Sequence, residues 1–492
     1  MTAVLSSIRR ILLGALIAAA LLLVAFGPRG VEHAPPGRVV VTYWEKWTDF
    51  EGEAMRRLCA LFNDTVGAEK GIYVDYVVTT QIDLKTLIAT AGGDPPDLAG
   101  LWPHNVSSFA SKKALTPLSR AADAGIDEQK ILPVYYRQCF YHDTMYAVPL
   151  TPWSLALYYN QDIFDEFADQ LAAAGYSADR PPRTLEELAD YASIMQRRDS
   201  EGRIEMLGFL PGVPETIGWY WLTWGLWCGG DFFDPASQRF RIDTPEYICG
   251  YQWVRDFSER IGVREILRFE SSLANFNSPD NPFMIGRLVM VQQGPWFANM
   301  IRQYAPEIRY GAAPFPTHDG SEISYCGQDV LVIPAGAHHP DEAWAFIEWL
   351  YNAGPVNVPS GKPQPQRGYE YYEVPTSAGV ERRPMPAMPP IEWLCWIHYK
   401  NSPLREVSEA FRQTHPNPAL AVHDRAARSP QARTEPPLPN WSELLGEFLA
   451  AYRDIWAGKV DVAERLRRSQ QRIDELSELA RRNLERYGEV YP

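Results

Sequence analysis

The sequence predicts an α/β protein that is built from more than one folded unit. A chain of 492 residues is too long for a single hydrophobic core. Apolar runs of strand length alternate with amphipathic stretches of helix length, a pattern typical of parallel sheets with right-handed crossovers. Hydrophobic residues make up 46% of the chain, as is normal for a globular protein.

The alternation is clearest in the first hundred residues. Apolar, β-rich runs predict strands over residues 39–44, 72–78 and 97–101. The intervening residues 51–63 and 81–91 have helical spacing of their apolar side chains. In parallel sheets of this kind, ligands bind at the carboxyl ends of the strands.

Aromatic and polar residues occur together at those strand ends. Trp44, Glu45 and Trp47 close the first strand, Gln81 follows the second, and Trp102 follows the third. A mixture of rings and hydrogen-bonding groups suits a ligand that is rich in hydroxyl groups. The alternative, that these are ordinary loop residues, stays open at this point.

The middle of the chain has two extended runs, 146–150 and 154–159, which precede a further helix. Pro149 and Pro152 have no amide hydrogen, so neither fits a central strand. We therefore expect residues 151–153 to be a connection between two short strands.

Two later stretches contain the remaining aromatic candidates. Residues 281–296 predict a buried strand that ends at Gly294, and Trp296 begins the next helix. Residues 216–228 predict a helix dense in tryptophan, which includes Trp224. Most rings of this helix are expected in a core, and one or two are expected in a binding site.

In their order and spacing, these motifs resemble the extracellular solute-binding proteins of ABC importers, in particular the sugar-binding, maltose-binding-protein-like family. Residues 146–164 are similar to its interlobe crossover, and 281–296 to its Phe-x-x-Gly-Lys segment, with Arg287 in place of Lys. The resemblance covers about 39–351 and 441–484. It implies an α/β, two-lobed periplasmic-binding-protein fold, in which each lobe is a mainly parallel sheet flanked by helices and the lobes are joined by hinge crossovers.

The resemblance also implies a division of the chain. Crossings between lobes are expected near 147–153, near 327–331 and again after about 355. The expected parts are a signal or N-terminal membrane anchor with a linker (1–37), lobe one (38–147 and 329–360) and lobe two (148–328 and 361–492). Residues 355–440 form a Pro-rich departure from the family, and their lobe is left open.

The function that the resemblance implies is capture of a small solute, a mono- or oligosaccharide, for delivery to an ABC permease in the inner membrane. Indole rings would stack on the C–H faces of the sugar, and polar side chains would bind its hydroxyl groups. The expected ligand-binding residues are Trp44, Glu45, Trp47, Gln81 and Trp102 from lobe one, and Trp153, Trp224, Trp296 and Asp329 from the other lobe and the hinge. We expect a monomer.

Other functional classes receive less support. A net charge of −14 argues against binding of nucleic acid. Motifs of serine hydrolases, zinc proteases and dinucleotide-binding enzymes are missing from the sequence, so we expect no catalytic residues, no cofactor and no metal. Two alternatives remain, a membrane-tethered ligand sensor and a secreted glycoside hydrolase, since paired carboxylates have no fixed motif.

The N-terminus predicts export. Arg9 and Arg10 precede an apolar run at 11–26, which is typical of a signal peptide or a membrane anchor. No cysteine follows the run, so a lipoprotein signal is not indicated. We expect a periplasmic or extracytoplasmic protein, which residues 11–26 could tether to the cytoplasmic membrane.

Six cysteines are spread through the chain without a C-x-x-C pair. Cys228 and Cys249 flank a predicted hairpin and could form a disulfide in an oxidising compartment. The alternative is that all six are buried free thiols.

Overall fold

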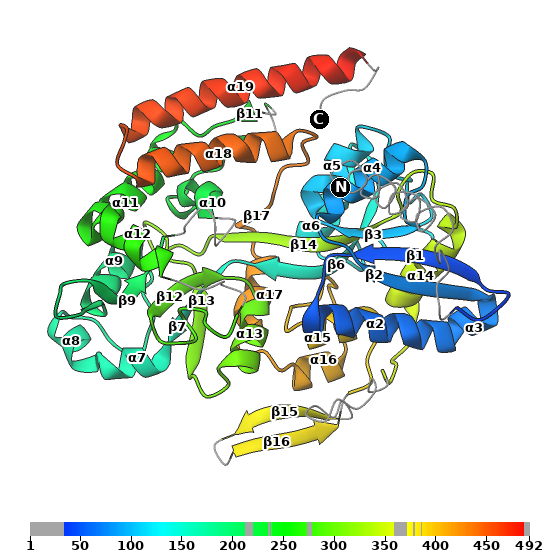
Figure 1. Cartoon of the computed structure of the whole chain (residues 1–492), viewed down its shortest axis with the longest axis horizontal. Helices are drawn as coiled ribbons and strands as arrows, with labels where there is room; N and C mark the ends of the chain where they lie inside the picture. Colours follow the sequence, from blue (N-terminus) through cyan, green and yellow to red (C-terminus); the bar gives the residue numbers. More distant parts are fainter. Residues whose placement is uncertain are drawn as a thin grey trace, which may run out of the picture.

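A computed structural model describes residues 34–211, 220–234, 237, 239–272, 278–358, 371–376, 379–384 and 386–486. Two α/β lobes lie side by side, and the long strands β6 and β14 run between them (Figure 1). Buried apolar side chains form two separate cores, one in each lobe. The two-lobed fold is therefore as predicted.

Lobe one is built on a sheet with the strand order β17-β14-β3-β1-β2. Strand β1 (Val39–Glu45) lies between β2 (Ile72–Val78) and β3 (Leu98–Leu101) and is parallel to both. Strand β14 (Ser324–Val332) is antiparallel to β3 and to β6 (Ala147–Ser154). The other elements that belong to or pack on this lobe are β17 (Ala432–Arg433), α2 (Asp49–Asp64), α3 (Val66–Lys70), α4 (Ile82–Gly92), α5 (Pro103–Ala110), α6 (Pro133–Tyr136), η1 (Arg137–Cys139), β4 (Phe140–Tyr141), β5 (Thr144–Met145), α14 (Pro340–Asn352), α15 (Pro390–Ile397) and α16 (Glu409–Thr414).

Lobe two has a sheet with the order β13-β7-β12-β9-β8. Only the pair β12 (Leu288–Gln293) and β9 (Ile204–Phe209) is parallel; β7 (Ala156–Asn160) is antiparallel to β12 and to β13 (Tyr310–Pro314). The expectation of a mainly parallel sheet is wrong for this lobe, because β7 enters directly from the crossover and runs against its neighbours. The other elements are β8 (Arg197–Arg198), α7 (Gln161–Glu166), α8 (Ala168–Ala173), α9 (Leu185–Ile194), α10 (Tyr220–Trp227), β10 (Phe233–Asp234), β11 (Arg239–Phe240), α11 (Pro245–Ile261), α12 (Val263–Ser271) and α13 (Trp296–Tyr304).

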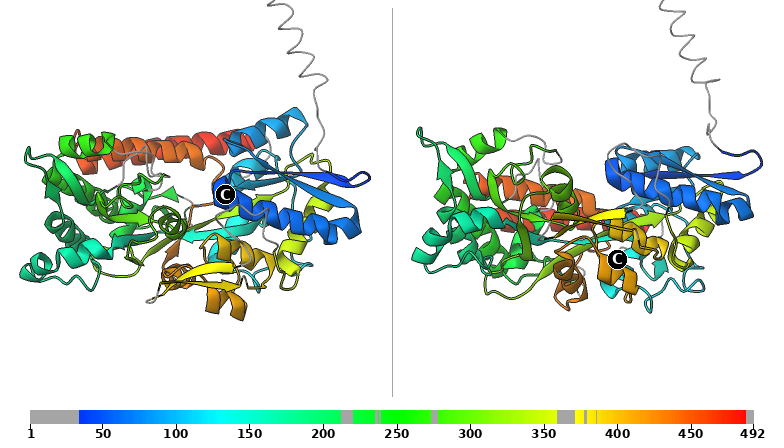
Figure 2. Two further views of the ribbon diagram at one scale, coloured as in Figure 1. Left: turned by 60° about the horizontal axis from the view of Figure 1, so that its bottom comes forward. Right: turned by 90° about the horizontal axis from the view of Figure 1, so that it is seen from below.

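Helices α18 (Trp441–Trp456) and α19 (Val462–Arg486) form an antiparallel pair that lies along lobe two (Figure 2). Their apolar side chains, including Leu444, Phe448 and Leu466, are buried in the lobe-two core. Helix α18 also contacts α5 of lobe one. The chain therefore returns from the first lobe to the second before it ends.

The first crossover differs from the prediction. Strand β6 continues through Pro149, Pro152 and Trp153, where we expected a connection. It pairs with β14 alone, so its prolines sit on an edge strand, where a missing amide hydrogen costs no ladder bond. The register shift between Gln328 and Val330 accommodates the irregular partner.

The Pro-rich segment crosses the junction. Residues of α15, with Trp393 and Trp396, pack into the lobe-one core, in the segment whose lobe the sequence left open. Tyr399 and Ala419 pack instead on the lobe-two core. Helix α17 (Leu420–Arg428) contacts β6, β13 and β14, and a short ribbon of β15 (Tyr371–Thr376) and β16 (Gly379–Pro384) precedes α15.

The cysteines divide into two groups. Cys228 and Cys249 form a disulfide that joins the end of α10 to α11, as one of the two readings proposed. The other four are buried free thiols. His318 lies beside the disulfide, but two bonded sulfurs offer no thiolate to a metal ion.

The predicted anchor at 11–26 lies outside the described residues. Among the helices that are described, none combines the length and the apolar character that a membrane span requires.

Candidate functional site

The paired strands β6 and β14, which we call the hinge ribbon, carry on one face the residues that join the two lobes. Side chains alternate along a strand, so Thr151 and Trp153 of β6 share a face, as do Gly327 and Asp329 of β14. Gly327 pairs with Trp153, and a Cβ atom at Gly327 would lie 2.1 Å from the indole ring. The absence of a side chain at Gly327 therefore lets the ring lie flat across β14.

Asp329 is the centre of a buried ion-pair network. Its carboxylate is 3.0 Å from Nζ of Lys46 and 3.2 Å from Nζ of Lys400, and it accepts a 2.6 Å hydrogen bond from Thr151 Oγ1. Lys46 Nζ also lies 3.2 Å from Glu45. The network thus joins the end of β1, both hinge strands and the segment after α15.

Glu51, in the first turn of α2, is the outer member of the network. Its carboxylate is 3.5 Å from Lys400 Nζ and 3.8 Å from Nδ1 of the buried His398. Three carboxylates therefore share two ammonium groups. We call Glu45, Lys46, Glu51, Asp329 and Lys400 the hinge charge network.

Burial and mutual attraction set the protonation of these groups. Burial alone would raise the pKa of Asp329, but the ammonium groups of Lys46 and Lys400 outweigh it and hold that pKa well below its usual range. Burial raises the pKa of Glu45 and of Glu51, and the neighbouring lysines offset this effect only in part. Burial would lower the pKa of both lysines, but the carboxylates raise it overall, so both are charged.

Two indole rings enclose the lysines. Lys46 Nζ lies 5.3 Å from the ring centre of Trp47 and 5.0 Å from that of Trp102, and Lys400 Nζ lies 5.6 Å from Trp47. Trp102 stacks on His104 with ring centres 6.0 Å apart. These are cation–π distances, so the rings contribute to holding the charges.

A second pair of rings crosses from the hinge to lobe two. Trp153 meets Trp296 edge to face, with centres 6.3 Å apart. Trp296 Nε1 donates to Gln293 at 3.1 Å, and a Cβ atom at Gly294 would lie 2.1 Å from the Trp296 ring. The turn from β12 into α13 therefore needs a glycine in order to place this ring at the end of the sheet.

The structure places six of the nine predicted residues in two groups. Glu45, Trp47, Trp102 and Asp329 meet around Lys46, and Trp153 meets Trp296. Trp44 points to the other face of β1 from Glu45, because side chains alternate along the strand. Gln81 is exposed at the start of α4, in the left-handed region with φ of 52°.

Trp224 differs from the expectation most. Its side chain is 0% exposed, stacks on Trp253 with ring centres 5.0 Å apart, and packs against Phe315. The ring is part of the lobe-two core, because a helix that covers a sheet turns its large apolar side chains inward.

The sequence-based list omitted the cations. Lys46 lies between Glu45 and Trp47, and its place at a strand end was a usable signal. Lys400 and Glu51 gave no such signal, because Lys400 lies in the Pro-rich segment and Glu51 lies in a helix. Both carboxylates on the list, Glu45 and Asp329, are engaged by the lysines, so a hydroxyl group would have to share them.

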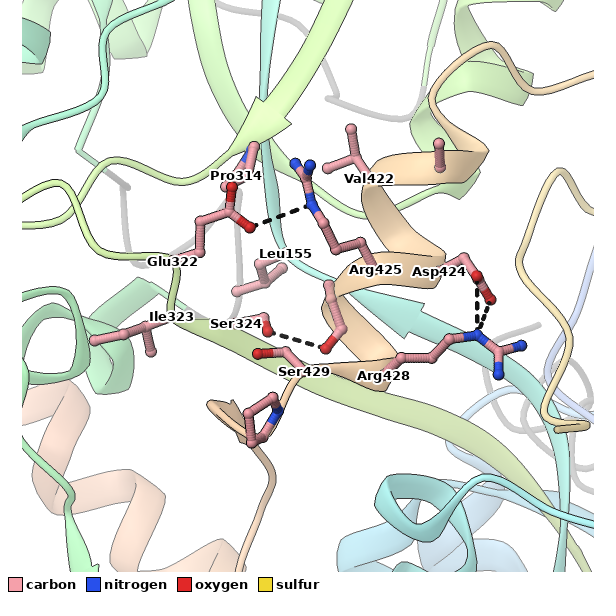
Figure 3. Close-up of a pocket in the computed structure, with 13 residues that line it drawn as sticks. Leu155, Pro314, Glu322, Ile323, Ser324, Val422, Asp424, Arg425, Arg428 and Ser429 are labelled. Carbon is pink, nitrogen blue, oxygen red and sulfur yellow. Dashed lines mark hydrogen bonds and ion pairs between the residues drawn. The ribbon is translucent and has the colours of Figure 1, made fainter.

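A separate cavity of about 530 Å³ lies on the hinge between β13, β14 and α17 (Figure 3). Leu155, Ile323 and Val422 form part of its lining. Its charged groups are engaged with each other: Arg425 with Glu322 and Arg428 with Asp424 (Figure 3). None of the predicted site residues lines it.

A family model, described as bacterial extracellular solute-binding protein, matches residues 52–356. The chain belongs to this family. The match begins after β1 and spans β2, β3, both hinge strands and the sheet of the second lobe. Trp102, Trp153, Trp296 and Asp329 lie within it, and Glu45, Lys46, Trp47, Glu51 and Lys400 lie outside it.

Curated relatives of this family member include binding proteins for different solutes. A maltotriose-binding protein of Pyrococcus abyssi is 26% identical over 286 residues, which cover 56% of each chain. An sn-glycerol-3-phosphate-binding periplasmic protein of Salmonella paratyphi A is 22% identical over 404 residues, covering 74% of this chain and 85% of the relative. The chain thus spans about half the length of the first of these relatives.

Solved structures are similar in fold. A protein with mannobiose bound superposes with a TM-score of 0.68 and 21% identity, and covers 88% of this chain and 99% of its own. The GacH receptor of Streptomyces glaucescens gives a TM-score of 0.66 with 17% identity, covering 89% of this chain and 98% of its own.

Proposed function

We propose that the protein is an extracytoplasmic solute-binding protein that captures a mono- or oligosaccharide and delivers it to an ABC permease. The observation that supports this most directly is the pairing of indole rings with a polar hinge at the ends of the sheets of a two-lobed member of this family. Trp47 and Trp102 come from lobe one, Trp153 from the hinge and Trp296 from lobe two. Closure of the lobes would bring rings from both sides onto one ligand.

The roles divide by chemistry. The rings stack on the apolar faces of the sugar. The carboxylates of the hinge charge network accept hydrogen bonds from its hydroxyl groups, as the lysine side chains move to share them. The names of similar proteins, which include maltotriose, mannobiose and acarbose as ligands, are in line with a hydroxyl-rich solute. A Kd near micromolar, about −8 kcal/mol, is within reach of such contacts.

Calorimetry of the full chain against mono- and oligosaccharides tests the proposal. Trp296→Ala should weaken binding of the best sugar by about ten- to a hundredfold, through the loss of roughly 1.5–3 kcal/mol of contact. Tyr304→Ala, at the far end of the same helix, is the matched control and should change the Kd little. Full binding by Trp296→Ala would contradict the site assignment, and hydrolysis of a glycoside during titration would favour a glycoside hydrolase.

The proposed location is the outer side of the cytoplasmic membrane, with the protein either free in the periplasm or tethered through residues 11–26. We further propose that it acts as a monomer with its permease. Fractionation separates the cases: release by osmotic shock indicates a free receptor, and retention in the membrane pellet indicates a tether. A tethered protein that binds sugar without any permease supporting uptake would favour the sensor alternative.

A further inference from the structure

We infer that the site takes uncharged saccharides and rejects their anionic counterparts, such as sugar phosphates and sugar acids. This inference rests on the proposed function and deepens it. It concerns a choice that the relatives leave open, because they include binding proteins for both a neutral oligosaccharide and a phosphate ester.

The first observation is the balance of charge at the hinge. Glu45, Glu51 and Asp329 contribute three carboxylates, and Lys46 and Lys400 contribute two ammonium groups. The site therefore holds one more acidic group than basic group before any ligand arrives. An anionic ligand would add to this excess.

The second observation is that both ammonium groups are already fully engaged. Lys46 Nζ contacts Glu45 and Asp329, and also donates to the carbonyl oxygens of Gly100 and Leu101 at 3.4 Å. Lys400 Nζ contacts Asp329 and Glu51. A phosphate group needs free donors of this kind, and taking a lysine from the network would leave a buried carboxylate without its partner.

A further carboxylate lies near the lobe-one rings. Glu435 is 3.2 Å from Nδ1 of His104, which stacks on Trp102. Both side chains are largely buried, with 9% and 20% exposed. A further acidic group therefore lies next to the ring that stacks on Trp102.

The residues that immediately precede Trp296 supply no compensating cation. In the described part of the chain, Trp296 and its neighbours Gln293, Gly294 and Pro295 present rings and neutral groups. The lobe-two segments outside the described residues, 212–219, 235–236, 238 and 273–277, contain no lysine or arginine. The net charge of −14 also opposes the approach of an anion.

Matched pairs of ligands test the inference directly. Calorimetry on the full chain would compare maltose with maltose 1-phosphate, galactose with galacturonate, and glycerol with sn-glycerol 3-phosphate. We expect at least one neutral saccharide to bind and its anionic counterpart to bind about a hundredfold more weakly, as an uncompensated buried charge requires. Equal or tighter binding of the anionic member would overturn the inference but leave solute capture intact.

A charge-neutralising variant gives a second readout. Glu51→Gln removes one of the three carboxylates, so the ratio of neutral to anionic affinity should fall by about tenfold. Glu322→Gln makes the same change of net charge at an exposed pair beside the hinge cavity, and should leave the ratio unchanged. An equal change in both variants would show that overall charge, and not the hinge charge network, sets the preference. Failure of every saccharide to bind would reject the proposed function and this inference with it.

Discussion

Two histidines, His398 and His423, are buried around the hinge and His415 is half-buried there, and their rings act as neutral hydrogen-bonding groups. His423 of α17 lies between Ser154 Oγ, at 2.8 Å from Nδ1, and Tyr158 Oη, at 2.9 Å from Nε2. Burial lowers the pKa of His423, and that of His415, to about 3, and lowers the pKa of His398 as well. The helix from the Pro-rich segment is thereby fixed to the first crossover.

We predict that this arrangement makes the fold acid-labile. His423 binds a proton near pH 6.5 when unfolded, but only near pH 3 when folded, so unfolding takes up a proton between these values. The contribution of neutral His423 to the free energy of unfolding is fully present above pH 6.5. It is lost at about 1.4 kcal/mol per pH unit as the pH falls toward 3. Urea unfolding of the wild type and of His423→Gln at pH 7, 6 and 5 should show a shallower slope in the variant. Parallel slopes would contradict the assignment.

The lysines of the hinge charge network lead to a second prediction. Lys400→Met removes the ammonium group that Asp329 and Glu51 share, and should lower the free energy of unfolding at pH 7 by about 3–5 kcal/mol. Lys85→Met, at an exposed position on α4, is the matched control and should change stability by less than about 0.5 kcal/mol. A small effect of Lys400→Met in denaturant unfolding would mean that the network is not maintained in solution.

At the residue scale, aromatic candidates were easier to predict than charged ones. Trp47, Trp102 and Trp296 follow strand ends, and a strand end fixes where a side chain lies in the fold. Lys400 reaches Asp329 from 71 positions further along the chain, through a segment without a family pattern. Nothing local in the sequence encodes such a contact.

At the scale of elements, the indole ring of Trp153 on β6 can pack against β14 only because the backbone at Gly327 has no side chain. We predict that Gly327→Ala displaces Trp153, because the added Cβ would meet the indole 2.1 Å away. Sugar affinity should fall by about tenfold or more and the tryptophan emission should shift, with the fold retained. Gly446→Ala in α18 is the control: nothing lies within 4 Å of its Cβ position, so stability should rise by about 0.5–1 kcal/mol. An unchanged Kd for the sugar in Gly327→Ala would show that Trp153 does not contribute to binding.

Strands and helices were predictable where the spacing of apolar side chains and the position of capping residues indicate the same element. Thr184 accepts a hydrogen bond from the amide of Glu187 at 3.1 Å, and Asn160 accepts one from Ile163, as their spacing before a helix predicts. The prolines of β6 were misleading. Proline forbids a central strand, and the sequence alone does not reveal that β6 has a neighbour on one side only.

At the scale of the whole molecule, the two-lobed organisation followed from the order of the motifs, and the mixed strand directions did not. A hinge strand can enter a sheet in either direction without changing its own pattern of apolar residues. The path of residues 388–438 was likewise hidden, because side chains that alternate between two cores have no single period.

A ligand held between the lobes should stabilise both of them together. We expect the best neutral sugar, at a hundred times its Kd, to add about 2.7 kcal/mol to the free energy of unfolding. Thermal unfolding should shift as a single step, because the ligand contacts residues from each core. Stabilisation of one step only, with the other unchanged, would place the sugar within one lobe and contradict an interlobe site.

The single disulfide has a consequence for biosynthesis. Cys228 and Cys249 are 21 positions apart, whereas every other pair of consecutive cysteines is separated by at least 69. Closing the shorter loop costs the least entropy, so an oxidant that meets the newly translocated chain would join these two sulfurs first. The remaining four thiols become inaccessible once the cores form. Correct pairing can therefore be selected by proximity along the chain, without reshuffling by an isomerase.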